Sequence, residues 1–416
     1  MSAKTIVICS DGTGNTYSGV ESNVLRLYRL VLKDDPGQVA CYDPGLGTLP
    51  RAAGRNPLRR RLRHYSELMF GNGAIENVTQ LYRFLMRVYE PDDRVFLFGF
   101  SRGAFTVRAL AGLLHVSGLV RSGDDHLVEY ATGLYETTEQ RIKRALRQQG
   151  RKHFSATETD HAILDLAASQ FKSTLSRPCS VTFMGIWDTV KAYGWMLPRS
   201  FPALRHNPSV TMVRQAVALD ERRGVFQVTG WGDRRPATVD GRIPILEVWF
   251  AGDHSDVGGG HESGNTALSD ATLNWMLGEA TAAGLKLKGD PATRKEVNKI
   301  ASGSLLAPEA VKHDLPRKSW RWRVPLPRVE LNNRAYPPCR WPRMWPIDAR
   351  APSRHGEGEK EIYLHKSIQR RGELDTRYRP ESILNRNRNP ESEGVTRVVY
   401  VESQTATNFT DAQPRS

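Results

Sequence analysis

One stretch of this chain, residues 94–114, joins a short apolar run, a Gly-x-Ser-x-Gly pentapeptide and an apolar helical pattern. The run 95–98 is typical of a buried strand, and the pattern over 104–114 is typical of a helix. A serine at a sharp strand-to-helix turn needs glycines on both sides, because larger side chains would collide with the strand and the helix. The stretch therefore predicts a nucleophile elbow at Ser101, with a chance loop as the alternative.

Further buried strands and amphipathic helices alternate along the chain. Strands are predicted at 5–10, 38–42, 180–187 and 243–251, and helices at 23–31, 74–89, 210–219 and 267–283. This order predicts an α/β-hydrolase-like fold, with a mostly parallel sheet and helices on both faces. Residues 123–176 are charged and helical in pattern and lie between two core strands. We expect them to form an inserted helical cap, with ordinary crossover helices as the alternative.

The composition of the chain changes near its three-quarter point. We expect an α/β-hydrolase catalytic domain over residues 1–285. Residues 286–416 are interpreted as a basic, irregular C-terminal extension rich in Trp, Arg and Pro that packs on the catalytic domain. Within it, we expect segments 361–368 and 379–384 to be ordered and the tail 405–416 to be disordered.

The chain is strongly basic, with 59 Lys and Arg against 45 Asp and Glu and a net charge of +14. This charge suggests anionic surroundings, such as lipid headgroups, nucleic acid or an acidic partner. The arginine-rich stretch 51–63 is either a solvated loop or a patch that faces headgroups. Tryptophan is interleaved with arginine at 320–323 and 340–345, which suits a membrane interface, single-stranded nucleic acid, or packing against the main domain.

The sequence also bears on localisation. It contains no run of 18 or more apolar residues, and its first apolar run is too short for a signal peptide. We therefore expect no transmembrane helix and a cytoplasmic protein, with export by a signal-free machine left open. The four cysteines, Cys9, Cys41, Cys179 and Cys339, are scattered without C-x-x-C spacing, and three of them lie in or beside apolar runs. This predicts buried free thiols rather than disulfides or a zinc site.

Two further polar residues follow directly after predicted strands. Asp188 ends one strand, and His254 follows another and precedes three glycines. The chain order Ser101, Asp188, His254 is that of the α/β-hydrolase triad. In such a triad the histidine takes the serine proton, and the carboxylate orients the imidazole. The alternatives are that Asp188 caps a turn, and that His261 or His365 serves as the base.

Backbone amides near Ser101 are the candidates for an oxyanion hole. The N–H of Arg102 lies at the start of the elbow helix, and Gly12 or Thr13, in the glycine-rich loop after the first strand, can supply a second donor. This loop lacks the spacing of the nucleotide-binding glycine motifs. The alternative is a tight turn in which Asp11 caps the next helix.

The sequence predicts no metal and no cofactor. His254 and Asp256 could form an HxD-like metal site, but no second histidine or carboxylate pair accompanies them at ligand spacing. The charged run 220–223 follows the predicted helix 210–219. We interpret it as a helix end or a buried ion-pair cluster, and not as catalytic.

Six motifs stand in one order along residues 5–285: DGTGN, GFSRGAFTVRALAGLL, GIWDTVKAYG, ALDERR, FAGDHSDVGGG and LSDATLNWML. The chain thereby resembles the DUF2235 family, the α/β-hydrolase catalytic domain of the Tle1-type phospholipase effectors of bacterial type VI secretion. The resemblance implies a hydrolase of phospholipid esters with Ser101 as nucleophile, Asp188 as acid and His254 as base. It also implies export by type VI secretion and a secretion-system or immunity partner.

The chain departs from this family pattern in two respects. It carries Gln215 where many relatives have a histidine before the ALDERR motif. Gln215 is not one of the three triad residues, so this departure leaves the triad assignment unchanged. Nothing in the chain firmly matches the membrane-anchoring module that the effectors carry.

These observations favour a serine hydrolase that cleaves carboxylic esters, with phospholipids at a membrane surface as the expected substrate. A lipid or small ester is the expected ligand, and the basic surface is expected to contact anionic membrane peripherally. One alternative is a soluble carboxylesterase or thioesterase without a lipid role. Another is a non-catalytic homologue that binds membrane or nucleic acid, and the intact triad argues against it.

Overall fold

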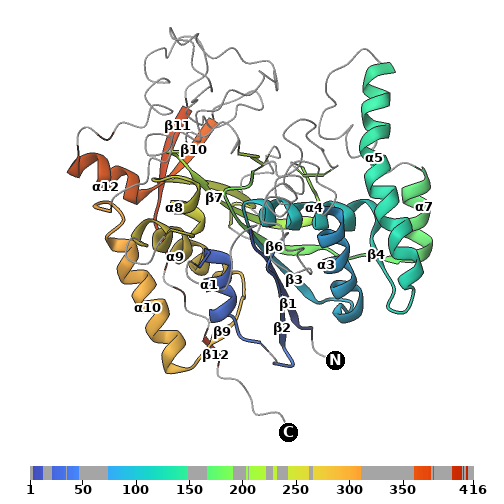
Figure 1. The fold of residues 1–416 in the computed structure, drawn as a ribbon, viewed down its shortest axis with the longest axis horizontal. Coiled ribbons are helices and arrows are strands. Elements are labelled where there is room, and N and C mark those ends of the chain that lie inside the picture. Colours follow the sequence, from blue (N-terminus) through green and yellow to red (C-terminus); the bar gives the residue numbers. More distant parts are fainter. Residues whose placement is uncertain are drawn as a thin grey trace, which may run out of the picture.

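The computed structural model of the chain describes residues 3–12, 21–33, 35–45, 74–148, 166–190, 203–204, 206–221, 228–231, 242–261, 266–310, 360–375, 378, 396–404, 406 and 409–410. These residues form an eight-stranded sheet with helices on both faces (Figure 1). The strand order across the sheet is β11-β10-β8-β7-β6-β3-β1-β2, and each neighbouring pair is parallel. The fold is therefore of the expected α/β class.

The bounds of the elements lie close to most of those predicted. The strands of the main sheet are β1 (Thr5–Ser10), β2 (Gln38–Asp43), β3 (Arg94–Phe100), β6 (Val181–Trp187), β7 (Val210–Ala218), β8 (Ile245–Phe250), β10 (Lys360–His365) and β11 (Thr396–Val401). Two short pairs join β4 (Leu119–Val120) to β5 (Ser176–Arg177) and β9 (Leu287–Lys288) to β12 (Phe409–Thr410). The helical segments are α1 (Asn23–Leu30), α3 (Ala74–Val88), α4 (Arg102–Ser117), η1 (Asp125–Leu127), α5 (Val128–Gln148), α7 (Leu166–Leu175), α8 (His254–Gly258), α9 (Ala267–Ala282), α10 (Pro291–Leu305) and α12 (Lys366–Leu374).

Successive residues of β1 point to opposite faces of the sheet and enter two different cores. Ile6 and Ile8 pack in one core with residues of α3, α4 and α5, whereas Val7 and Cys9 pack in the other with residues of α1, α9 and α10. A central parallel strand is covered on both faces, and its sequence is therefore apolar throughout. Figure 1 shows α3, α4, α5 and α7 on one side and α1, α9 and α10 on the other.

The prediction of a helix over 210–219 is wrong, because this segment is strand β7 between β6 and β8. A strand buried on both faces has no alternating pattern, and valines at 210, 213 and 217 imitate helical spacing. Its central polar residues have partners in the core. Arg214 pairs with Glu279 of α9, and the Gln215 side chain accepts from Arg108 of α4.

The main sheet continues beyond residue 285, the boundary expected from composition. Strand β10 pairs with β8, and β11 pairs with β10. Part of the tail expected to be disordered is also ordered, because β12 pairs with β9 and Ala406 is buried in the core. The composition predicts an irregular extension because Trp, Arg and Pro are concentrated at 311–359. These residues lie outside the described part of the chain, as do 51–63 and 379–384.

Between β4 and β5, the described residues 121–148 and 166–175 contain η1, α5 and α7. Helices α5 and α7 pack against α4, and α5 also contacts α3. The role of residues 123–176 as a cap over the substrate stays a prediction. Among the described residues, no helix is long and apolar enough to cross a membrane. Cys9 and Cys179 are buried free thiols, as predicted, whereas Cys41 is a free thiol that is only partly buried. Cys339 lies outside the described residues.

The order of strands reverses between β1 and β3. From β1 the chain adds β2 on one side, whereas β3 and the later strands of the sheet lie on the other side. Ser10 at the end of β1 lies in register with Gly99 near the end of β3. Ligands of open α/β sheets bind outside the carboxyl ends of strands at such a switch point. The candidate site lies at this edge.

Candidate active site

The serine elbow has the geometry that its sequence predicts. Ser101 lies between β3 and α4 with φ 57° and ψ −117°, a backbone conformation that is rare for a residue with a side chain. A Cβ atom on Gly99 would lie 2.6 Å from the Gly103 carbonyl oxygen, and one on Gly103 would lie 2.0 Å from the Ser10 carbonyl oxygen. Both glycines are therefore required by close backbone approach. Ser101 lies between them at the carboxyl end of β3.

Ser101, His254 and Asp188 form one hydrogen-bonded chain. His254 Nε2 lies 2.9 Å from Ser101 Oγ, and His254 Nδ1 lies 2.5 Å from Asp188 Oδ2. The other Asp188 oxygen accepts the backbone N–H of Ala218 at 3.0 Å. The three residues come from the ends of β3, β8 and β6, and they are 8%, 5% and 0% exposed. This arrangement can move a proton from the serine hydroxyl to the imidazole while the carboxylate holds the imidazole tautomer.

The loop that carries His254 folds tightly against the elbow. Asp253 caps helix α8 by accepting from the N–H groups of Ser255 and Asp256, and the Asp256 side chain accepts from the Asp253 N–H, which completes a capping box. A Cβ atom on Gly258 would lie 1.9 Å from the ring of Phe100. The glycine therefore lets α8 approach that ring, which lies 4.7 Å from the imidazole of His254 between centroids.

Two acidic residues after β7 hold the same loop. Asp220 Oδ2 accepts the Gly252 N–H at 2.8 Å, and Glu221 Oε2 accepts the His254 N–H at 3.2 Å. The sequence predicts a helix end or an ion-pair cluster at this point, because 210–219 has helical spacing, but the segment is strand β7. The signal that could have found Asp220 and Glu221 is their position directly after a buried strand, as for Asp188.

The structure places two of the three oxyanion candidates next to Ser101. Arg102 is the first residue of α4, so its N–H is among those that the intrahelical ladder does not use. A Cβ atom on Gly12 would lie 3.4 Å from Ser101 Cβ, but the Gly12 N–H donates to Asp11 Oδ1 at 2.7 Å. Thr13 lies outside the described residues. Gly12 therefore lies beside the serine, but its amide N–H is already hydrogen-bonded to the Asp11 carboxylate.

Asp11 organises the loop that carries Gly12. Its Oδ2 accepts from the hydroxyl groups of Ser22 and Tyr42. Ser22, and not Asp11, is the N-cap of α1, because its side chain accepts from the Leu25 N–H. The neighbouring Asp43 accepts from the Ser10 hydroxyl at 2.8 Å, and burial raises the pKa of its carboxyl above the usual value.

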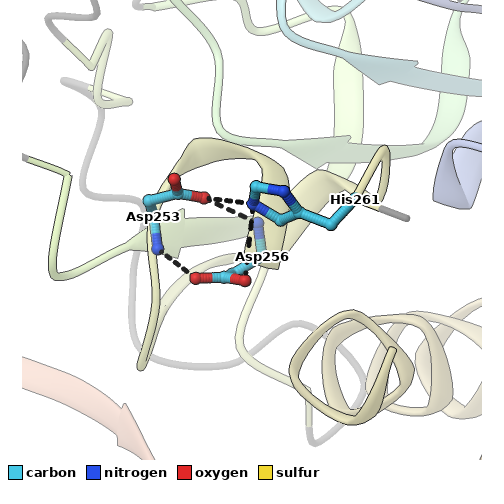
Figure 2. A group of neighbouring side chains, drawn as sticks. All are labelled: Asp253, Asp256 and His261. Atoms are coloured by element: carbon cyan, nitrogen blue, oxygen red, sulfur yellow. Dashed lines mark hydrogen bonds and ion pairs between the residues drawn. The ribbon is translucent and has the colours of Figure 1, made fainter. Parts of the chain in front are cut away.

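Neither alternative base contacts the serine in the part of the chain that the structure describes. His261 Nε2 lies 3.0 Å from Asp253 Oδ1 and 3.5 Å from Asp256 Oδ1 (Figure 2). His365 is bonded to the hydroxyl groups of Ser367 and Ser403, and burial lowers its pKa to about 4.

Asp253, Asp256 and His261 could together offer three ligands to a metal ion, since their donor atoms lie within 4.8 Å of one another. The metal pair considered from sequence, His254 and Asp256, is not brought together in this way, because His254 faces Ser101. The hydrogen bonds of the capping box and of His261 account for the positions of the two carboxylates. The group is explained as a helix cap.

The fold and the site together define an α/β protein with a buried Ser-His-Asp chain at its switch point. The family model for the T6SS phospholipase effector Tle1-like catalytic domain matches residues 4–279, and the chain belongs to this family. The yeast Saccharomyces cerevisiae has an uncharacterized protein that is 34% identical over 234 residues, which cover 54% of this chain and 32% of the yeast protein.

Two solved structures are also similar. A crystal structure of an uncharacterized protein from Pseudomonas aeruginosa has 21% identity and a TM-score of 0.39, and the match covers 72% of this chain and 48% of that one. The structure of the Tle1 effector bound to the VgrG spike from the type 6 secretion system has 22% identity and a TM-score of 0.28, with 62% and 51% covered. The chain thus spans about a third of the yeast protein and about half of each solved chain.

Proposed function

We propose that this chain is a serine hydrolase that cleaves carboxylic esters of phospholipids in a phospholipase A-type reaction. The observation that carries the proposal is the hydrogen-bonded chain from Ser101 through His254 to Asp188, with contacts of 2.9 and 2.5 Å. Membership of a phospholipase effector family supports the lipid class. The bond that breaks is the ester bond between the acyl carbonyl carbon and the glycerol oxygen.

His254 acts first as general base and then as general acid. Its Nε2 takes the hydroxyl proton while Ser101 Oγ attacks the carbonyl carbon, and the same proton then goes to the leaving lysophospholipid oxygen. Asp188 keeps the other proton on Nδ1 and stabilises the imidazolium between these steps. A water molecule, activated by His254 in the same way, hydrolyses the acyl-Ser101 ester and releases the fatty acid.

The Arg102 amide is the first proposed donor to the oxyanion. It lies at the N-terminus of α4, where the helix dipole favours negative charge beside Ser101. Gly12 can contribute only by exchanging its bond to Asp11 for one to the oxyanion, since that amide is already bonded. Thr13 stays a prediction for the second donor.

The surroundings of the reaction are proposed from charge and family. A net charge of +14 favours contact with anionic headgroups at a membrane surface. The neighbouring Tle1 structure is bound to a VgrG spike, so we propose a secretion-system partner and export by type VI secretion for this chain. An immunity partner belongs to the same proposal.

The test is fatty-acid release from vesicles of mixed anionic and zwitterionic phospholipid, with wild type and Ser101→Ala in parallel. We expect release by wild type and a fall of at least about 1,000-fold in Ser101→Ala, because the nucleophile is lost. Ser173→Ala is the matched control, since Ser173 is an exposed serine on α7. Hydrolysis of short soluble esters alone would leave a carboxylesterase, and vesicle binding without any hydrolysis would contradict the enzyme.

A further inference from the structure

The loop that presents His254 is fixed by side chains from outside the loop. Two of its amides, on Gly252 and His254, donate to Asp220 and Glu221, which follow β7. Glu221 is 1% exposed, so its carboxylate lies in the interior, where it accepts the backbone N–H of His254. A buried charge is stabilised by such bonds, and in return it restricts the group that donates to it.

A third residue reaches this pair from the C-terminal segment. The hydroxyl of Tyr378 donates to Asp220 Oδ2 at 2.9 Å, the same oxygen that accepts from Gly252. Burial and the charge of Asp220 raise the pKa of Tyr378 well above its usual value. The phenol therefore remains a hydrogen-bond donor at neutral pH.

Tyr378 is itself held in place by α12. The Arg371 guanidinium lies 5.3 Å from the centre of the Tyr378 ring and donates to the carbonyl oxygens of Ala307 and Ala310, in the turn that follows α10. A continuous set of contacts thus runs from the C-terminal segment through Asp220 to the loop of the base. Tyr378 lies outside the residues 4–279 that match the family.

We propose that Asp220 and Glu221 are positioning residues for His254, and that Tyr378 extends this support into the C-terminal segment. The proposal rests on the proposed function, because it names what orients the base of that reaction. His254 must keep one nitrogen on Ser101 and the other on Asp188 at the same time. Catalytic groups must be held within about 0.5 Å of the productive geometry, and a displacement of about 1 Å can cost about 100-fold in rate.

The first test is Tyr378→Phe, which removes one oxygen atom and keeps the ring on Arg371. We expect kcat on phospholipid vesicles to fall about tenfold with KM within about twofold, because base geometry and not lipid binding is disturbed. Tyr400→Phe is the matched control, since Tyr400 is a 42% exposed tyrosine on β11, and it should behave as wild type. A change in KM alone, or wild-type kcat in Tyr378→Phe, would overturn the proposal.

A comparison of two variants at Glu221 separates positioning from general stability. Glu221→Gln keeps an acceptor for the His254 N–H, whereas Glu221→Ala removes it. We expect kcat to fall about 100-fold in Glu221→Ala, but by no more than about tenfold in Glu221→Gln. Equal kcat in the two variants, with both folded by their thermal transitions, would contradict the role of the acceptor.

A measurement without substrate distinguishes failure of this proposal from failure of the proposed function. Hydrogen–deuterium exchange read by mass spectrometry reports the Gly252 and His254 amides in peptides that cover 251–258. We expect faster exchange there in Tyr378→Phe and unchanged exchange in peptides from β1 and β3. If wild type releases no fatty acid, the function fails, while unchanged exchange at 251–258 in Tyr378→Phe would overturn the positioning proposal by itself.

Discussion

The serine elbow (residues 99–103) and the base loop (residues 251–258, which carry His254) meet at the hydrogen bond between Ser101 Oγ and His254 Nε2, but they are built in different ways. The elbow is determined by close backbone contacts at its two glycines: an added Cβ atom would lie 2.6 Å from the Gly103 carbonyl oxygen at Gly99, and 2.0 Å from the Ser10 carbonyl oxygen of β1 at Gly103. The base loop takes its position from Asp220, Glu221 and Tyr378, which are far from His254 in the chain. The elbow is thus fixed by steric contact with backbone, whereas the loop of His254 also depends on polar contacts from residues far away in the chain.

This difference predicts how each half responds to substitution. Backbone collisions cannot be relieved by a small movement in a closely packed strand-turn-helix unit, so the elbow should tolerate almost no change. A hydrogen-bonded loop can lose one contact and retain the others, so the base loop should lose activity in steps. Three further predictions test this contrast, in order of decreasing effect on activity.

The largest effect is expected from Gly103→Ala in the elbow. The new methyl group would lie 2.0 Å from the Ser10 carbonyl oxygen, so α4 or β1 must shift. We expect the free energy of unfolding to fall by about 3 kcal/mol and kcat/KM by at least about 100-fold. Urea unfolding and vesicle hydrolysis measure the two effects.

Gly133→Ala is the control for that substitution. Gly133 lies inside α5, and a Cβ atom there would have no neighbour within 4 Å. Because alanine favours a helix interior over glycine, we expect a gain of up to about 1 kcal/mol and unchanged activity. Wild-type stability and activity in Gly103→Ala would show that sterics do not fix the elbow, and the contrast between the two halves would be lost.

A smaller effect is expected from Asp253→Ala in the base loop. Asp253 Oδ1 accepts from the N–H groups of Ser255 and Asp256 and contacts His261, so its loss removes the cap of α8. Removing an N-cap costs about 1 kcal/mol, and we expect kcat to fall about tenfold because His254 is the first residue of that helix. Steady-state kinetics on vesicles measure the fall.

Asp253→Asn and a chelator complete this test. Asparagine caps helices about as well as aspartate, so Asp253→Asn should keep most of the activity. EDTA should leave wild-type kcat unchanged, because the cap needs only hydrogen bonds. If EDTA inactivates the enzyme and added Zn²⁺ or Mn²⁺ restores it, then Asp253, Asp256 and His261 bind a metal and the cap is not their main role.

The same contrast explains what could be predicted from the sequence. The elbow, β1, β6 and the chain order of Ser101, Asp188 and His254 are visible as apolar runs that end in a polar residue, because each depends on neighbours in sequence. Strand β7 was missed because burial on both faces removed its alternation, and the positions of Asp220 and Glu221 were missed with it. Tyr378 carried no signal, because its contact with Asp220 spans 158 residues of chain.

The smallest effect on activity, and the clearest sign of remote support, is expected from His365. Its Nδ1 accepts the Ser367 N–H as the N-cap of α12, its Nε2 bonds to Ser403, and its ring stacks on Phe250 at the end of β8. Protonation of Nδ1 would break the cap of the helix that leads to Tyr378. Burial opposes this protonation and lowers the pKa to about 4, while Glu402 raises it and Arg370 lowers it to a smaller extent.

The sign of the resulting pH dependence follows from proton binding. In the unfolded chain this histidine takes up a proton near pH 6.5, and in the folded chain only near pH 4, so the unfolded state binds more protons between these values. The contribution of His365 to the free energy of unfolding is therefore fully present above pH 6.5. It is lost as the pH falls toward 4, which lowers the free energy of unfolding by up to about 3 kcal/mol. Urea unfolding of wild type and His365→Gln at several pH values measures the difference between their slopes.

We expect His365→Gln to lose less stability than wild type over this interval, and to keep near wild-type kcat at neutral pH. His126→Gln, at an exposed histidine of η1, should show the wild-type slope. Hydrogen exchange adds the location: on acidification, peptides from β10 and α12 should lose protection before peptides from β3 and α4. Simultaneous loss in both would mean that the two halves of the site unfold as one unit, and that the C-terminal segment supports the base no more than it supports the elbow.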